Sequence, residues 1–207
     1  MDDLNEQEDF WKNEFGNEYS SRKNNNYKII EQRETEFKKY LKRTNGINSV
    51  LEFGANIGLN LSILKSMIEG LSLHAVEINQ SAIKDLEKIV PAENIFEGSF
   101  TEFTSTLKFD LVVSRGVLIH LNPDDLPKAY EQLYTYTNKY ILISEYFNTD
   151  PVSVDYRGYQ NKLFKRDFCK EILDMYSDLN LIDYGFLYSS DSNYKYDDLT
   201  WFLLEKR

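Results

Sequence analysis

The chain has 207 residues, 42% of them hydrophobic, which is enough for one compact domain with a buried core. Its formal net charge is −10 and its lysines and arginines are interspersed with acids, which disfavours a nucleic-acid partner because such a partner requires a basic surface. The first ten residues contain no apolar segment typical of a secretory signal, and no apolar run approaches the roughly 20 residues of a membrane span, so we expect a cytoplasmic protein with no membrane partner.

After a charged N-terminal segment, apolar segments typical of buried strands alternate with segments of helical periodicity. The alternation repeats four times, which predicts a parallel sheet with helices on both faces. The last two strands follow each other directly and should pair antiparallel. Strands are predicted over residues 49–54, 71–79, 94–100, 108–116, 139–147, 179–189 and 197–207, and helices over residues 59–70, 80–90, 122–137 and 165–177.

The predicted fold class is therefore α/β, with a Rossmann-like, seven-stranded, mostly parallel sheet, helices on both faces and one antiparallel strand near the C-terminus. We expect a single domain over residues 1–207, in which residues 1–45 form an N-terminal helical lid or cap and residues 46–207 form the Rossmann-like core. The single cysteine, Cys169, has no disulfide partner. It lies in a helical pattern, where a small buried hydrophobic residue is expected rather than a reactive thiol.

The segment "VLEFGANIGLN" joins the first strand to the next helix through a glycine turn, and in a doubly wound sheet this turn lies at the ligand-binding edge. A dinucleotide fingerprint requires three glycines, but these positions hold Gly54, Asn56 and Leu59. A side chain at the middle position blocks the approach of a pyrophosphate. Asn56 tolerates a left-handed backbone and would cover the ligand with its amide. The pattern of Glu52, Gly54 and Gly58 thus suits a ligand without a diphosphate.

The ends of the next two strands predict contacts to a nucleoside. Glu77 ends the second strand, where a carboxylate can accept hydrogen bonds from both hydroxyls of a ribose; alternatively, it caps the helix that follows. Ser99 and the backbone N–H of Phe100 follow the third strand, where they would meet the edge of an adenine. A ribose and an adenine without a diphosphate describe S-adenosyl-L-methionine (SAM), whose ammonium group Glu52 would face.

With these residues, the sequence resembles the class I SAM-dependent methyltransferases, and specifically the small family of methyltransferases associated with pseudaminic acid biosynthesis. The resemblance covers nearly the whole chain and rests on "FWKNEFGNEYSSR", "VLEFGANIGLN", "LHAVEIN", "FDLVVSRGVLIHLNP", "YILISEYFN", "YRGYQNKLFKRDF" and "DYGFLY…DDLTWFLLEKR". It implies a Rossmann-like enzyme that methylates a nonulosonic acid sugar or a precursor and releases S-adenosyl-L-homocysteine (SAH). Ser99 stands where the wider superfamily commonly has an acid.

Methyl transfer from SAM requires in-line approach of the acceptor in a site that excludes water, and a hydroxyl acceptor also needs a base. His120 follows the fourth strand, near where the methyl group should point, and is the candidate catalytic base; alternatively, it shapes the pocket wall. The other histidine, His74, lies inside the second strand and is expected to be structural. Carboxylates and histidines show no metal-ligand spacing, so no metal is expected.

Three aromatic residues near the N-terminus, Trp11, Phe15 and Tyr19, have the spacing of one helical face, with Arg22 three residues further on. One interpretation is an amphipathic helix packed on the domain. The other is a lid whose rings cover the cofactor while Tyr19 and Arg22 bind the methionine carboxylate. The predicted cofactor contacts are Trp11, Phe15, Tyr19, Arg22, Glu52, Gly54, Ala55, Asn56, Gly58, Glu77, Ile78, Ser99, Phe100, Ser114, Arg115 and Gly116.

Residues 148–165 are too polar for a core and too long for a plain connection, so we expect a functional loop over the acceptor. The expected partner is a small molecule, a sugar acid or a nucleotide sugar, whose carboxylate and ring match arginine and tyrosine side chains. Two alternatives stay open, namely methyl transfer to a protein or peptide side chain, and a SAM-binding regulator without turnover. The predicted acceptor contacts are Arg115, Glu145, Tyr146, Arg157, Tyr159 and Arg166.

Overall fold

The computed structural model of the chain describes residues 5–22, 27–192 and 198–207, so the first residue of the last predicted strand, residue 197, lies outside it. Within these ranges, one seven-stranded sheet has the order β3-β2-β1-β4-β5-β9-β8. Only β9 runs antiparallel to its neighbours, β5 and β8, which confirms the predicted fold class. The strands of this sheet are β1 (Ser49–Phe53), β2 (Ser72–Glu77), β3 (Ile95–Glu97), β4 (Phe109–Arg115), β5 (Thr137–Glu145), β8 (Leu179–Leu187) and β9 (Leu199–Lys206).

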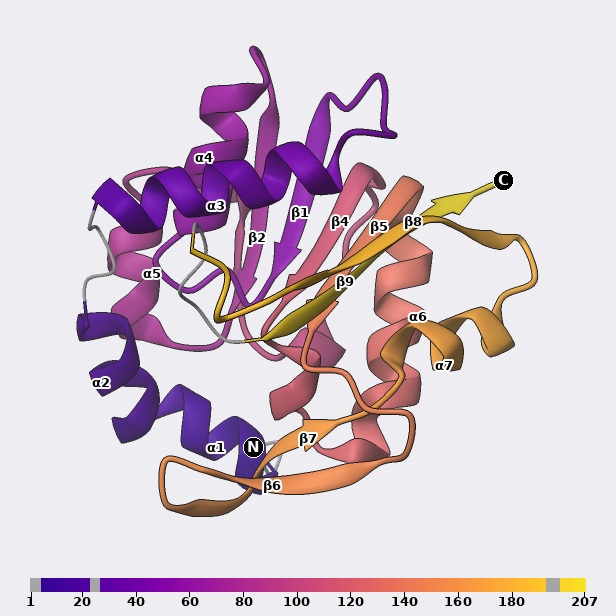
Figure 1. Cartoon of the computed structure of the whole chain (residues 1–207). Helices are drawn as coiled ribbons and strands as arrows, with labels where there is room; N and C mark the ends of the chain where they lie inside the picture. Colours follow the sequence, from indigo (N-terminus) through magenta and orange to yellow (C-terminus); the bar gives the residue numbers. More distant parts are fainter. Residues whose placement is uncertain (1–4, 23–26, 193–197) are drawn as a thin grey trace.

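Helices cover both faces of the sheet (Figure 1). Successive side chains of a strand point to opposite faces, so Val50 packs in the core on one side and Leu51 in the core on the other. One face carries α3 (Tyr27–Tyr40), α4 (Leu59–Met67) and α5 (Gln80–Leu86), and the other carries α6 (Leu126–Tyr136) and α7 (Phe168–Met175). Short 3-10 turns are η1 (Ala92–Asn94), η2 (Phe100–Glu102), η3 (Leu118–His120) and η4 (Pro123–Asp125).

A roof lies across the carboxyl ends of the strands (Figure 1). It consists of α1 (Glu6–Lys12), α2 (Glu14–Ser21) and a two-stranded hairpin of β6 (Val152–Tyr156) and β7 (Tyr159–Lys165). We call α1 and α2 the lid. Among the described residues, no helix is both long and apolar enough to cross a membrane.

The lid is two helices, whereas the spacing of its aromatic residues predicts one. Asn13, with φ −105° and ψ −134°, separates α1 from α2, and its side chain donates to Asp9 Oδ1 at 2.7 Å. Such local side-chain bonds compete with continuation of a helix. The ring of Trp11 still lies 5.3 Å from the rings of both Phe15 and Tyr19, because the bend folds α2 back against α1.

The third helix of the N-terminal segment does not belong to the lid. Phe37 and Tyr40 of α3 are fully buried on the sheet, and the Tyr40 ring lies 5.1 Å from that of Trp201. The predicted lid over residues 1–45 is therefore narrower in the structure and ends, within the described residues, with α2.

Two predicted segments differ in secondary structure. Most of the loop predicted over residues 148–165 forms the hairpin, over residues 152–165, with Arg157 (φ 53°) and Gly158 (φ 89°) in the left-handed turn conformation that suits a tight hairpin. Most of its residues are exposed, although β6 has the alternating sequence Val-Ser-Val-Asp-Tyr that is typical of a strand. The third strand stops at Glu97, earlier than predicted, because Ser99 caps the turn η2.

Cys169 lies buried between α7 and the sheet. Its burial raises the pKa of the thiol to about 12, which keeps it protonated and unreactive.

Gly58 begins α4 at a point where that helix packs closely on the end of α5. Its φ is +81°, and a Cβ atom there would lie 2.8 Å from Leu86 Cδ1. Gly70 has a similar φ of +73° with no atom within 4 Å, so it provides a matched control. We expect Gly58→Ala to lower the free energy of unfolding by at least about 1 kcal/mol more than Gly70→Ala, since overpacking costs typically about 1–3 kcal/mol. Urea unfolding measures both, and equal losses would show that α5 yields to the added methyl group.

Candidate functional site

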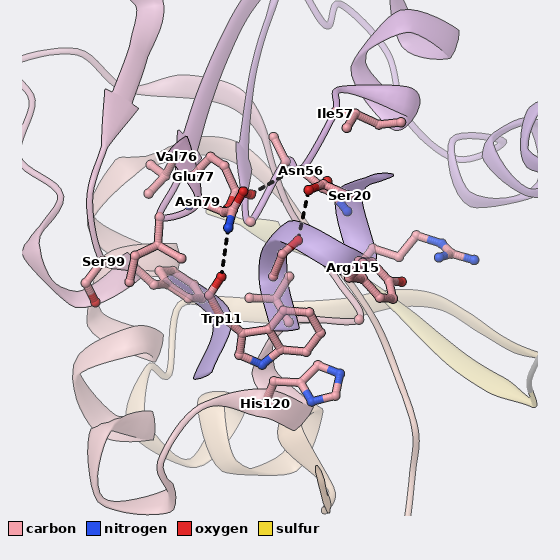
Figure 2. A pocket seen from close by; sticks show the side chains of 18 of the residues that line it. Trp11, Ser20, Asn56, Ile57, Val76, Glu77, Asn79, Ser99, Arg115 and His120 are labelled. Carbon is pink, nitrogen blue, oxygen red and sulfur yellow. Dashed lines mark hydrogen bonds between the residues drawn. The ribbon is translucent and has the colours of Figure 1, made fainter. Parts of the chain in front are cut away.

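A cavity of about 210 Å³ lies at the carboxyl ends of β1, β2, β3 and β4, beneath the lid. Figure 2 shows Ser99 on one side of this cavity and Arg115 on the other, with Glu77 and Asn56 between them. The cavity is lined by these predicted residues: Trp11, Tyr19, Gly54, Ala55, Asn56, Glu77, Ile78, Ser99, Phe100, Arg115, Gly116 and His120.

The glycine turn after β1 is held by the carboxylate of Glu77. Asn56 adopts a left-handed backbone, with φ 49°, and its N–H donates to Glu77 Oε2 at 2.6 Å. Glu77 Oε1 accepts from the N–H of Asn79 at 2.8 Å, and Asn79 is the N-cap of α5. Glu77 therefore faces the cavity and also organises the start of the next helix. Burial raises the pKa of its carboxyl group.

The lid is attached to the sheet through Asn79. Its side-chain amide donates to the carbonyl oxygens of Trp11 at 3.3 Å and Lys12 at 3.1 Å, and to Asn17 Oδ1 at 2.9 Å (Figure 2 draws the bond to Trp11). Gly16 allows this close approach, because a Cβ atom there would lie 2.7 Å from Asn79 Nδ2. The lid thus rests on a polar side chain whose position the turn after β2 fixes.

The lid is also attached to the hairpin and to the end of β3. Lys162 Nζ lies 2.6 Å from Glu6 Oε1, and Gln7 Nε2 donates to the carbonyl oxygen of Asn161 at 3.1 Å. The hydroxyl of Ser99 donates to Glu8 Oε1. These contacts close the roof of the cavity and limit the access of water.

A network of buried charges lies at the opposite end of the cavity. Arg33 Nη1 donates to Asn60 Oδ1 at 2.9 Å, and Asn60 Nδ2 donates to Glu52 Oε1 at 2.5 Å. Arg115 Nη2 donates to Glu36 Oε2 at 2.9 Å. Both arginines line the cavity, whereas Glu52 lies behind Asn60 and is 1% exposed. This burial raises the pKa of Glu52 to about 8.

Several buried polar atoms around the cavity have no hydrogen-bond partner among the described residues. They include Trp11 Nε1, Asn56 Oδ1 and Glu52 Oε2. Buried polar groups in folded proteins are nearly always hydrogen-bonded. Unpaired polar atoms of this kind are expected where a bound ligand supplies the missing hydrogen bonds.

His120 forms part of the cavity wall and is 8% exposed. Its Nδ1 lies 2.6 Å from the carbonyl oxygen of Lys162, which makes Nδ1 the protonated nitrogen, and its ring lies 4.6 Å from Trp11 and 4.8 Å from Tyr156. Burial lowers its pKa to about 4, so the imidazole is neutral near pH 7. A base of such low pKa is weak, so the geometry favours the interpretation in which His120 shapes the wall.

Glu145 is predicted to contact the acceptor, but the structure buries it beneath the cavity wall. Its Oε1 accepts from the N–H groups of Val117 and Leu118, both at 3.1 Å, and from Ser114 Oγ at 3.0 Å. It thereby holds the turn η3 that carries His120. Glu145 and Ser114 are therefore positioned to support the site, and neither lines the cavity.

The other predicted residues outside the cavity lining lie at its rim or on the hairpin. Arg22 is exposed and lies 6.0 Å from the Phe15 ring and 5.8 Å from the Tyr19 ring. Arg157 stacks on Tyr156, at 5.5 Å, and Arg166 donates to Glu171 at 2.8 Å. The predicted residues that do not line the cavity are Phe15, Arg22, Glu52, Gly58, Ser114, Glu145, Tyr146, Arg157, Tyr159 and Arg166.

Four polar or charged residues are among the cavity-lining residues that the sequence did not predict. Arg33 and Glu8 come from charged helices, and nothing in their spacing distinguishes them from solvent-facing charges. Asn79 follows the second strand, in the segment "HAVEIN", where an N-cap signal was available. Asn60 lies shortly after Gly58 and could have been identified as a partner of Glu52. In the part of the chain that the structure describes, no group of three or more His, Cys, Asp or Glu side chains is arranged to hold a metal ion.

Comparison with known proteins identifies a methyltransferase region. Residues 51–139 match the family described as "Methyltransferase domain". No curated protein matches the chain. The plantazolicin methyltransferase BpumL, crystallised with a pentazolic desmethylPZN analog and SAH, is 13% identical over 97% of this chain and 95% of that chain, with a TM-score of 0.67.

Two further solved structures share the fold. Magnesium protoporphyrin IX methyltransferase from Synechocystis PCC 6803 with bound SAM is 14% identical over 100% of both chains, with a TM-score of 0.66. The 1,6-didemethyltoxoflavin-N1-methyltransferase of Burkholderia thailandensis is 14% identical over 97% of this chain and 86% of that chain, with a TM-score of 0.66. Residues 51–139 therefore match a methyltransferase family, and the whole chain shares the fold of these solved methyltransferases.

The buried carboxyl group of Glu52 gives a testable pH dependence of stability. Its pKa is raised from an ordinary value of 4.5 to about 8, so folding favours the protonated form. Its contribution to stability is complete below about pH 4.5 and is lost as the pH rises towards 8. A glutamine side chain cannot titrate but can still accept the Asn60 hydrogen bond, so we expect Glu52→Gln to gain stability relative to the wild type, by a few kcal/mol at most, between pH 5 and pH 8. Urea unfolding at a series of pH values measures the difference, and parallel curves would contradict the raised pKa.

Proposed function

We propose that this methyltransferase domain binds SAM in the cavity and transfers its methyl group to a small molecule. The observation that carries this proposal is the order of polar groups along one continuous cavity. Ser99 and Phe100 lie at one end, Glu77 and Asn56 in the middle, and Arg33 and Arg115 at the other end. This order matches an adenine, a ribose and an amino-acid tail. The solved structures with bound SAM or SAH support the same ligand.

The glycine turn favours a ligand without a diphosphate. Asn56 occupies the position where a dinucleotide-binding turn needs a bare backbone. Its N–H is already bonded to Glu77, so this donor is not available to a phosphate. Each carboxylate oxygen of Glu77 has a further lone pair, which leaves it able to accept from the hydroxyls of a ribose. The proposed contacts in this region are Gly54, Ala55, Asn56, Glu77 and Ile78.

For the methionine end, we propose Arg33 and Arg115 as the groups that bind the carboxylate. Both guanidinium groups line the cavity, and a guanidinium fork is well matched to a carboxylate. Glu36 neutralises one of the two positive charges, so a net positive charge is left for an anion. Tyr19 lines the cavity from the lid, whereas Arg22 points its charge over aromatic rings at the exposed surface. Glu52 lies behind Asn60, and although its raised pKa favours the protonated form, a methionine ammonium nearby would favour ionisation of its carboxyl group.

SAM, when bound, would supply an electrophilic methyl group, which passes to the acceptor atom as the bond from methyl carbon to sulfur breaks and SAH is released. The chain's contribution is to exclude water and to hold the acceptor in line. Trp11 of the lid, His120 and Tyr156 of the hairpin together form an aromatic wall. Because the Nδ1 proton of His120 is held by the Lys162 carbonyl, only Nε2 is left to accept a proton or a hydrogen bond. His120 is proposed as an orienting contact for the acceptor and, for a hydroxyl, as a weak base.

For the acceptor, we propose a sugar acid of the nonulosonic type or its nucleotide-activated precursor. The support is the resemblance of the chain's two ends to the pseudaminic acid-associated family, together with the hairpin that packs against Trp11 and His120 of the cavity wall. Arg157 and Tyr159 are exposed on this hairpin, and Tyr146 and Arg166 lie near its base. The similar structures include methyltransferases named for plantazolicin, magnesium protoporphyrin IX and 1,6-didemethyltoxoflavin, so the shared fold accommodates many acceptors.

The function is tested by conversion of SAM to SAH in the presence of candidate acceptors. We expect turnover with free nonulosonic acids or nucleotide sugars and none with model peptides. SAH binding without turnover on either panel would favour a SAM-binding regulator. Turnover on peptides alone would reassign the acceptor while keeping the methyltransferase activity.

Arg33 lines the cavity and Arg22 lies on the exposed surface of the lid. Ligands with and without the amino-acid tail distinguish which of these two arginines binds the methionine carboxylate. We expect Arg33→Ala to weaken SAH binding about tenfold or more, because it removes a charge-assisted hydrogen bond. Binding of 5′-methylthioadenosine, which lacks the carboxylate, should change little in the same variant. Arg22→Ala is the matched control and should retain both affinities in calorimetry. Loss of SAH binding in Arg22→Ala alone would place the carboxylate at the lid surface.

A further inference from the structure

Glu8 of the lid reaches the end of β3, although nothing in the sequence links it to the cofactor site. It lines the cavity, and its Oε1 accepts the hydrogen bond of the Ser99 hydroxyl. Its Oε2 accepts from the N–H of Asn5 at 3.2 Å, in the capping box that begins α1. Ser99 itself is 3% exposed. Glu8 is therefore a carboxylate held on two sides at the edge of the cavity.

This end of the cavity is where the base of a bound nucleoside would lie. β2 and β3 are parallel neighbours with Glu77 opposite Glu97, so a ribose at Glu77 directs its base over the residues that follow β3. Those residues include Ser99 and Phe100, which line the cavity. The amino edge of an adenine in this position requires hydrogen-bond acceptors.

Ser99 alone would not distinguish an amino group from a carbonyl oxygen. A serine hydroxyl is both donor and acceptor and rotates to suit its partner. Glu8 removes this ambiguity, because its carboxylate takes the single hydroxyl proton of Ser99. Ser99 then has no proton left to offer a ligand, and its oxygen already accepts from the backbone N–H of Thr101 at 3.3 Å and faces the Thr101 hydroxyl at 3.0 Å, so the acceptor that remains for the base is Glu8. A carboxylate oxygen has more than one acceptor site, so Glu8 Oε1 can accept from a second donor.

We propose that Glu8 is an adenine-specificity residue, which selects the 6-amino group of the cofactor both directly and by orienting the Ser99 hydroxyl. This inference rests on the proposed function as a SAM-binding protein. The acidic residue that contacts the adenine is thereby Glu8 of the lid, because the position that follows β3 holds Ser99 and not an acid. Because Glu8 belongs to α1, selection of the base depends on the closed position of the lid.

The test compares binding of SAH with binding of S-inosylhomocysteine, in which a carbonyl oxygen replaces the 6-amino group. In calorimetry, we expect the wild-type chain to prefer SAH by tenfold or more, because a carboxylate repels the carbonyl oxygen. Glu8→Gln offers an amide N–H₂ in place of one carboxylate oxygen, so the preference should fall at least fivefold or reverse. Glu8→Ala should weaken SAH binding and also lose the preference.

Asn5→Ala is the matched control, because it removes the N-cap of the same helix and keeps the carboxylate of Glu8. We expect it to weaken both ligands by the same factor and leave their ratio unchanged. A thermal unfolding curve for each variant checks that the fold is retained. An unchanged ratio in Glu8→Gln, or a wild type that binds both ligands equally, would overturn the role of Glu8 but not the proposed function. A wild type that binds neither ligand would overturn the proposed function itself.

Discussion

The site depends on the carboxylate of Glu77, which binds the backbone on both sides of the cavity. One oxygen holds the N–H of Asn56 in the glycine turn, and the other holds the N–H of Asn79 at the start of α5. Asn79 then holds the lid through the carbonyl oxygens of Trp11 and Lys12. The floor, one wall and the roof of the cavity are thus linked through two polar side chains. A ligand that contacts Glu77 is in contact with the group that positions all three.

The cavity combines this rigid backbone frame with charges that are costly to bury. Glu52 and Glu145 are almost completely buried, and burial raises their pKa values to about 8 and about 7. Neither is isolated, because Asn60 donates to Glu52 and backbone N–H groups donate to Glu145. Desolvation still costs free energy that the hydrogen bonds only partly offset. Such groups are typical of functional sites, where charged side chains are arranged to bind a ligand and not to maximise the stability of the fold.

Apart from Trp11 and Tyr19 of the lid, the cavity-lining residues that the sequence predicted lie close to a strand end. Gly54, Asn56, Glu77 and Ser99 lie at or just after the ends of buried apolar strands, and parallel strands bring their carboxyl ends to one edge. Glu145 also ends a strand, yet its side chain turns inward to backbone N–H groups. Strand position fixes the edge of the sheet at which a residue lies, but hydrogen-bond partners from another turn decide which way its side chain points.

The sequence by itself determined the α/β class, the single reversed strand and the ligand-binding edge, because these follow from local periodicity and from the order of strands and helices. The tertiary structure alone decided that the charged side chains of Arg33 and Glu8 enter the cavity next to the predicted Glu77 and Arg115. Arg33 and Glu8 lie on helices whose charge patterns resemble solvated faces, and they become part of the site only because those helices dock against the sheet edge.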